Sequence, residues 1–162
     1  MSTLTPAVRN ASLALLAAGT AASLSACGLV ASVLSPGGGN VMELSAGDCF
    51  IESEMEAAFS GDEVTNVPLV DCSEPHDAEV FHTEDLPDGD FPGEASLDNS
   101  IDEICYGSAF ANYVGVDFVD SELEVWPLVP TEEGWDMGDQ EILCYALDPT
   151  GTVSESFEGS NR

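Results

Sequence analysis

The cysteines of this 162-residue chain constrain its fold more than any other feature of the sequence. There are five, at positions 27, 49, 72, 105 and 144. Cysteine pairs persist as disulfides in oxidising compartments and stay reduced in the cytosol. The compartment therefore decides whether these residues cross-link the fold, and the N-terminal segment indicates which compartment it is.

The first 26 residues are typical of a cleavable export signal. Arg9 precedes an apolar segment, residues 11–24, which is too short and too rich in Ala, Ser and Thr for a transmembrane helix. The sequence Leu-Ser-Ala-Cys that ends at Cys27 resembles the lipobox of bacterial lipoproteins, in which the cysteine receives a diacylglyceryl group before cleavage. The resemblance implies a mature chain that begins at a lipidated Cys27. An ordinary signal peptide cut at the same place, with an incidental cysteine, is the alternative.

Lipidation would anchor the protein to the extracytoplasmic face of the cell membrane. Two acyl chains, such as palmitate, give stable attachment, whereas one chain binds only marginally. Residues 35–40, Ser-Pro-Gly-Gly-Gly-Asn, are typical of a flexible tether. We therefore expect a signal peptide over residues 1–26, a lipidated cysteine and linker over residues 27–42, and a folded domain over residues 43–160.

The expected domain is strongly acidic. All 31 acidic residues follow position 42, the only basic residues are Arg9 and Arg162, and the formal net charge is -29. Such a surface repels phosphate groups and anionic lipids, which argues against nucleic acid as a partner and against electrostatic membrane attachment. An acidic surface suits a salty or cation-rich exterior. Weak calcium binding is the alternative, although the sequence contains no EF-hand loop.

The expected fold is α+β, stapled by two disulfides. With Cys27 lipidated, four cysteines remain in an exported chain, and four cysteines can pair in three ways. Strand and turn signals favour a small antiparallel sheet built from hairpins, with one principal helix. That helix is expected over residues 100–114. Ser100 and Glu103 form a capping box, Asp98 is the alternative cap, and Gly115 ends the helix. The expected strands cover residues 49–51, 64–70, 78–82, 123–129 and 141–147, and the expected loops cover residues 52–63, 83–95 and 131–139.

Three stretches of the sequence suggest a family, and the second and third of them are the specific ones. They are residues 47–50 (Gly-Asp-Cys-Phe), 70–80 (Val-Asp-Cys-Ser-Glu-Pro-His-Asp-Ala-Glu-Val) and 135–144 (Trp-Asp-Met-Gly-Asp-Gln-Glu-Ile-Leu-Cys). Together they resemble the septum-formation-related domain of Gram-positive envelope proteins, over roughly residues 43–160. The resemblance implies an extracytoplasmic domain associated with septum formation. It also implies the disulfide pairs Cys49–Cys72 and Cys105–Cys144.

Four residues are candidates for a binding face: Pro75, His76, Glu79 and Trp135. The family resemblance implies that His76 follows Pro75 in a turn, where its ring can bond the backbone and set the corner. A structural role is therefore our main interpretation of His76, with ligand binding and catalysis as alternatives. Trp135 is interpreted as a core anchor, with recognition as the alternative. The His-x5-His spacing to His82 matches no common zinc signature, so we expect no metal site and no cofactor.

Nothing in the sequence names a reaction. It has no Gly-x-Ser-x-Gly elbow, and oxidised cysteines offer no thiolate nucleophile. We therefore predict a non-enzymatic, membrane-anchored lipoprotein that acts as an interaction module, linked to septum formation or cell division through a protein partner in the envelope. The alternatives are an envelope hydrolase or wall-modifying enzyme that uses His76 with a carboxylate, and a passive cation-binding surface protein.

Overall fold

The computed structural model describes residues 43–59 and 66–162, and the expected signal peptide, Cys27 and linker lie outside these ranges. The described strands pair in the order β2-β1-β3-β5-β4 to form one five-stranded antiparallel sheet, which confirms the expected α+β class. They are β1 (Cys49–Phe50), β2 (Leu69–Val70), β3 (Ala78–Asp85), β4 (Glu124–Leu128) and β5 (Glu141–Leu147). The helices are α1 (Glu52–Phe59), α2 (Glu94–Ile104), α3 (Ser108–Val114) and α4 (Glu132–Asp136), with a short 3-10 helix at Phe118–Asp120.

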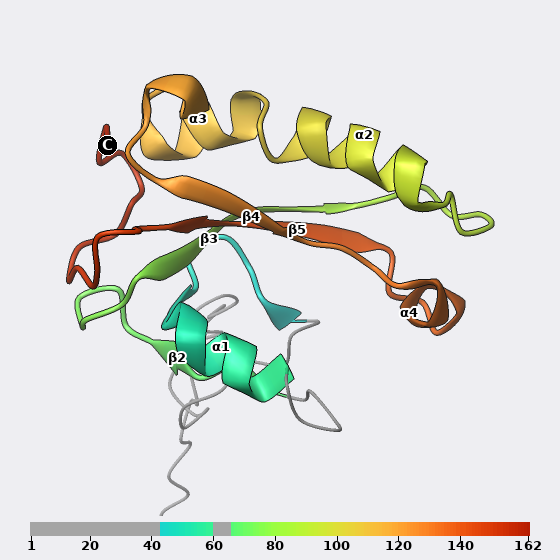
Figure 1. Cartoon of the computed structure of the whole chain (residues 1–162), viewed down its shortest axis with the longest axis horizontal. Helices are drawn as coiled ribbons and strands as arrows, with labels where there is room; N and C mark the ends of the chain where they lie inside the picture. Colours follow the sequence, from blue (N-terminus) through green and yellow to red (C-terminus); the bar gives the residue numbers. More distant parts are fainter. Residues whose placement is uncertain (1–42, 60–65) are drawn as a thin grey trace, which may run out of the picture. The chain divides into compact units, whose positions relative to one another are not determined.

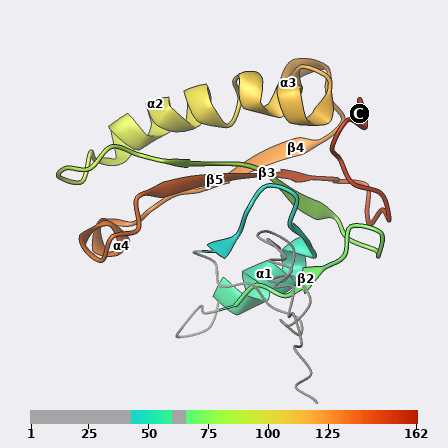
Figure 2. The ribbon, with the colours of Figure 1, turned by 180° about the vertical axis from the view of Figure 1, so that it is seen from behind.

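The sheet separates two layers of buried side chains. Successive side chains of a strand point to opposite faces, and β5 follows this rule closely. Ile142, Cys144 and Ala146 join the core that includes residues of α2 and α3, whereas Leu143 and Tyr145 join the core that includes Met55 of α1. The α2–α3 layer and α1 accordingly lie on opposite sides of the sheet (Figures 1 and 2). Both faces of β5 are therefore buried.

The expected strands are present, with altered bounds. β5 covers residues 141–147 as expected, and β4 is one residue shorter at each end than predicted. β3 continues to Asp85 instead of ending at His82, because it keeps pairing with β5 beyond a bulge at Phe81. The strand expected over residues 64–70 is reduced to β2, Leu69–Val70, and residues 60–65 lie outside the described ranges.

The start of the principal helix differs from the prediction. The helix begins at Glu94 after Gly93, and Ser100 lies within it, where its hydroxyl donates to the carbonyl of Ser96 at 3.2 Å. The prediction that Ser100 and Glu103 form a capping box is therefore wrong. The helix includes Glu94 and Ala95, the last two residues of the expected loop 83–95. Leu97 is 4% exposed, and the packing of this apolar side chain stabilises the added helical turn.

The principal helix is also bent, at Gly107 between α2 and α3. A Cβ atom on Gly107 would collide with the backbone carbonyl oxygen of Glu103, so only glycine allows this close approach. Gly115 ends α3 as predicted, in the left-handed conformation with φ of 95°. The disulfide Cys105–Cys144 ties the bend to β5.

The variant Gly107→Ala is expected to lower the free energy of unfolding by about 1–3 kcal/mol, because the added methyl group must push the backbone of α2 aside. Urea denaturation measures the loss. Ser108→Ala, at the exposed neighbouring position, is the control and should stay within about 0.5 kcal/mol of the parent. Equal stabilities for the two variants would show that the bend has room for a side chain.

Two segments expected to be loops are helical, α1 and α4. Both begin with acidic residues, which favour the positive end of a helix. The amide of Glu52 donates to the carboxylate of Asp77 at 2.7 Å, and the amide of Gly134 donates to the hydroxyl of Thr131 at 3.0 Å. These caps satisfy amide groups that the first helical turn leaves without partners. Among the described residues, no helix is long and apolar enough to cross a membrane.

Candidate functional site

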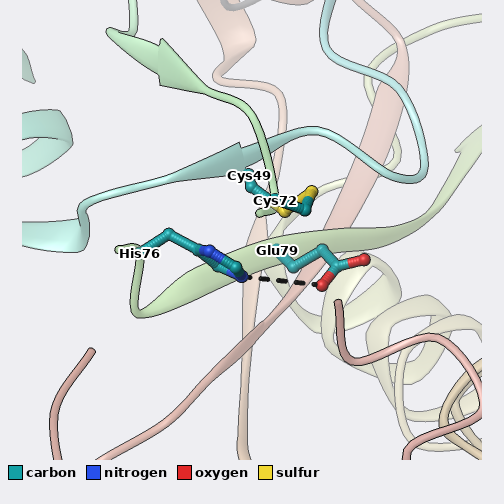
Figure 3. A group of neighbouring side chains, drawn as sticks. All are labelled: Cys49, Cys72, His76 and Glu79. Atoms are coloured by element: carbon teal, nitrogen blue, oxygen red, sulfur yellow. Dashed lines mark ion pairs between the residues drawn. A yellow bond between two sulfur atoms is a disulfide. The ribbon is translucent and has the colours of Figure 1, made fainter. Parts of the chain in front are cut away.

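A buried polar cluster lies where β1 meets β3 and the turn that precedes β3 (Figure 3). It contains His76, Glu79 and the disulfide Cys49–Cys72, and the side chains of His76 and Glu79 are 0% exposed. The imidazole and the carboxylate point toward each other, with Nε2 of His76 at 3.9 Å from Oε2 of Glu79. One donor atom from each of the four residues lies within 4.8 Å of the other three.

The backbone around the cluster is held from several sides. Cys49 of β1 lies opposite Glu79 in the β1–β3 pairing, and opposite Val70 in the β1–β2 pairing. His76 exchanges two backbone hydrogen bonds with Val153 of the C-terminal segment, at 2.9 and 2.7 Å. The disulfide then joins Cys49 to Cys72 in the turn. The second disulfide is Cys105–Cys144, so the pairing implied by the family resemblance is confirmed.

The carboxylate of Glu79 accepts three hydrogen bonds. The hydroxyls of Tyr113 and Ser156 donate to Oε1 at 2.6 and 2.7 Å, and the amide of Phe157 donates to Oε2 at 2.6 Å. A buried carboxylate is stable only when its oxygens are bonded in this way. Burial raises the pKa of Tyr113, and the hydrogen bond to Glu79 raises it further, so its hydroxyl remains a neutral donor. Glu79 therefore ties β3 to α3 and to the C-terminal segment.

The ring of His76 bonds the backbone of its own turn. Nδ1 lies 2.8 Å from the carbonyl oxygen of Glu74, which can only accept, so Nδ1 carries the hydrogen. In the neutral ring the lone pair is then on Nε2. Nε2 is buried and has no hydrogen-bond partner among the described residues, while the ring packs against Phe157 at 5.7 Å between centroids.

The four candidate binding residues have different surroundings. His76 and Glu79 come together in the cluster, and Pro75 is exposed beside them. Trp135 is 6% exposed, donates its indole N–H to the carbonyl of Gly89 at 2.8 Å, and packs edge-on against Phe91. The side chains of His76, Glu79 and Trp135 are therefore buried among neighbouring segments, and Trp135 alone of the three keeps a small exposed surface.

Sequence reasoning missed the residues that hold Glu79: Tyr113, Ser156 and Phe157. Tyr113 lies on α3, within the range predicted for the principal helix. Ser156 and Phe157 belong to the polar segment that follows Asp148, and Phe157 is 1% exposed. A single large aromatic residue in an otherwise polar tail is the signal that could have shown that this segment packs onto the domain.

A second buried carboxylate, Asp148, holds the end of the chain. It accepts hydrogen bonds from the amide and hydroxyl of Thr150, and from Nη2 of Arg162 at 2.6 Å. Burial by itself would raise the pKa of Asp148, but the bonds from Thr150 and Arg162 outweigh it and hold the pKa below its ordinary value. Arg162 is thus neutralised within the domain.

Asp148 is expected to stabilise the fold in a pH-dependent way. Because its pKa is lowered on folding, its contribution is present above the ordinary aspartate pKa of about 3.9 and is lost as the pH falls through the folded-state value. The stability difference between the parent and Asp148→Asn should therefore shrink as the pH drops from about 7 toward 2. Urea denaturation across this range measures it, and a difference independent of pH would contradict the assignment.

An acidic groove of about 650 Å³ lies between β3 and the helices α2 and α3. Within β3, β1 pairs only with Ala78 and Glu79. Among the described residues the outer edge of β3 from His82 to Asp85 therefore has no strand partner. Tyr113 lines the groove and also donates to Glu79, which connects the groove to the buried cluster. The polar lining of the groove includes three glutamates, Glu84, Glu103 and Glu158, together with His82, Asn112 and Tyr113.

The fold and the cluster define a small α+β domain with two disulfides, a buried structural histidine–glutamate pair and an acidic groove. The chain belongs to the septum-formation family, because the family model described as "Septum formation" matches residues 44–144. The match includes both disulfides, His76 and Glu79, and it confirms the family resemblance of the sequence. No curated protein and no solved structure matches the chain significantly. The segment that supplies Ser156, Phe157 and Arg162 lies beyond the matched residues.

Proposed function

We propose that this protein is a lipid-anchored, extracytoplasmic binding module that acts without catalysis in septum formation. The family match over residues 44–144 is the observation that carries the proposal. The lipobox-like sequence at Cys27 supports anchoring at the membrane, and the two disulfides support an oxidising compartment outside the cytoplasm. The partner is a protein of the envelope or the division machinery.

The acidic groove is the surface that we assign to this partner. Glu84 and Glu103 are both exposed there, and Glu158 adds a third carboxylate, so the groove suits a segment with basic side chains. The exposed turn residues Ser73, Glu74 and Pro75 offer further surface. Long-range attraction from the acidic domain would speed the encounter with a basic partner.

Burial of the cluster supports a binding module over a hydrolase. An enzyme that used His76 with a carboxylate would have to bring a wall polymer to Nε2 of His76 and to Glu79. Both side chains are 0% exposed, and Glu79 is already bonded to three donors. This burial argues against contact between a polymer and the pair.

The test is the location of a fluorescent fusion, joined after Arg162 by a flexible linker, in dividing cells of the native host. Enrichment at the septum that disappears with Cys27→Ser would support the proposal. An even signal around the envelope for the parent would contradict the septal role.

A charge-neutralised groove tests where the partner binds. The double variant Glu84→Gln/Glu103→Gln is expected to remain on the envelope but to lose septal enrichment. Glu132→Gln/Glu133→Gln, which removes two exposed charges from α4, is the matched control and should keep it. Equal behaviour of the two double variants would show that the groove does not bind the partner.

A further inference from the structure

The buried cluster contains a histidine nitrogen that the folded domain leaves unused. Nε2 of His76 is fully buried and has no hydrogen-bond partner among the described residues. A polar atom left in this state normally destabilises a fold. The Nδ1–H group donates to the carbonyl of Glu74, which fixes the ring with its Nε2 lone pair toward Glu79. Metal-binding histidines are oriented in this way, by donating the other ring N–H to a carbonyl or carboxylate.

The carboxylate opposite His76 is also prepared for a further bond. Oε1 of Glu79 accepts from Tyr113 and Ser156. Among the residues that the structure describes, Oε2, the oxygen nearer to His76, accepts only from the amide of Phe157. A carboxylate oxygen has two lone pairs, so Oε2 can accept one more partner. The three donors would act as an outer shell that keeps the carboxylate oriented toward a bound cation.

Two sulfur atoms complete the group. One donor atom from each of Cys49, Cys72, His76 and Glu79 lies within 4.8 Å of the other three, and the Cα atoms of the two cysteines are 5.4 Å apart. Tetrahedral zinc with sulfur at about 2.3 Å and nitrogen or oxygen at about 2.1 Å separates its ligand atoms by about 3.3–3.8 Å. Small side-chain movements would therefore turn this group into a tetrahedral site. The obstacle is the disulfide itself, because thiolates are the metal ligands and disulfide sulfurs are not.

We propose that reduction of the Cys49–Cys72 disulfide turns the cluster into a zinc site with Cys49, Cys72, His76 and Glu79 as its four ligands. A dithiol reductant gives two electrons and two protons to the disulfide, which yields two thiols and the oxidised reductant. Zn²⁺ then displaces both thiol protons as two zinc–sulfur bonds form. Exchange with an oxidised dithiol reverses the sequence, re-forms the sulfur–sulfur bond and releases the metal.

The two disulfides differ in their access to a reductant. Cys72 is partly exposed, whereas Cys105 and Cys144 are both 0% exposed. Thiol–disulfide exchange requires a thiolate to reach a sulfur atom, so the Cys49–Cys72 bond is expected to be reduced first. The core that contains Cys105–Cys144 would then stay cross-linked while the metal site forms.

Cobalt binding tests the proposal, since Co²⁺ takes the same tetrahedral sites as Zn²⁺ and is visible by its absorption. The full chain carrying Cys27→Ser, so that Cys27 adds no thiol, is purified in detergent, reduced with a phosphine and freed of reductant without air. We expect the reduced chain to bind one Co²⁺ with thiolate-to-cobalt absorption, to release it to Zn²⁺, and to lose the signal on reoxidation. A reduced chain that binds no more Co²⁺ than the oxidised chain would overturn the proposal, as would an unchanged signal in Cys49→Ser/Cys72→Ser.

Two variants test the other ligands. His76→Asn keeps a donor near the position of Nδ1 for the carbonyl of Glu74 and removes Nε2, and we expect at least a 10–100-fold loss of Co²⁺ affinity. His82→Asn, at the second histidine of the chain, should bind like the parent. Equal affinities for the two variants would overturn the assignment. If His76→Asn fails to fold, Tyr113→Phe is the deciding variant. Loss of its hydrogen bond to Glu79 should weaken Co²⁺ binding by about 10–100-fold. An unchanged Co²⁺ affinity would overturn the proposal.

Discussion

The double variant Cys105→Ala/Cys144→Ala is expected to lower the free energy of unfolding by about 4 kcal/mol. The two cysteines are 39 residues apart, and the chain-entropy model assigns a loop of this size about that stabilisation. Both residues are fully buried, and their bond joins the bend of the principal helix to the central strand β5. Since domains of this kind are stable by about 5–15 kcal/mol in total, the loss is a large share of the whole.

The matched comparison is Cys49→Ala/Cys72→Ala, which opens a loop of 23 residues and should lower the stability by about 3.5 kcal/mol. Urea denaturation of both double variants, each also carrying Cys27→Ser, measures the two losses on one scale. If both variants stayed within about 1 kcal/mol of the parent, the sheet and helices would hold the fold without cross-links, and the disulfides would not be its main support.

The strands follow from local sequence, whereas the disulfide pairing and two of the helices do not. The strand β5 can be predicted from its sequence, because it is a continuous apolar run whose alternate residues from Ile142 to Leu147 face the two cores. The disulfide pairing came from the family resemblance, because spacing alone allowed three patterns. The cap of α1 is Asp77, which lies 25 residues after Glu52, so no local pattern reveals it. The cap of α4 is local, at Thr131, but a five-residue helix is too short to show a period.

The candidate site was also predictable only in part, because some of its contacts are local in sequence and others are long-range. His76 bonds the backbone of its own turn, and the sequence around Pro75 is enough to suggest such a bond. The partners of Glu79 lie 34 to 78 residues away, on α3 and in the C-terminal segment. Sequence reasoning therefore assigned Glu79 to a binding face, although long-range hydrogen bonds place it in the interior.

The variant Glu79→Leu is expected to lower the free energy of unfolding by about 3–5 kcal/mol, because it leaves three donors without an acceptor. The hydroxyls of Tyr113 and Ser156 and the amide of Phe157 all donate to this carboxylate, and each unsatisfied donor in a buried site destabilises the fold by about 1–3 kcal/mol. Urea denaturation at neutral pH measures the loss. Glu84→Leu makes the same change at an exposed position of the same strand and should stay within about 0.5 kcal/mol of the parent.

A double-mutant cycle separates lost hydrogen bonds from a change of shape. Tyr113→Phe alone should lower the stability by about 1.5–3 kcal/mol, because its hydroxyl donates to a charged group. When Glu79 is already Leu, Tyr113→Phe should lower the stability by less than it does in the parent. In that background the hydroxyl of Tyr113 has no acceptor, so its removal takes away an unsatisfied donor. The coupling energy should then be about 0.5–3 kcal/mol. Strictly additive losses would mean that the two residues stabilise the domain independently, and that Glu79 does not join β3 to α3 through its hydrogen bond to Tyr113.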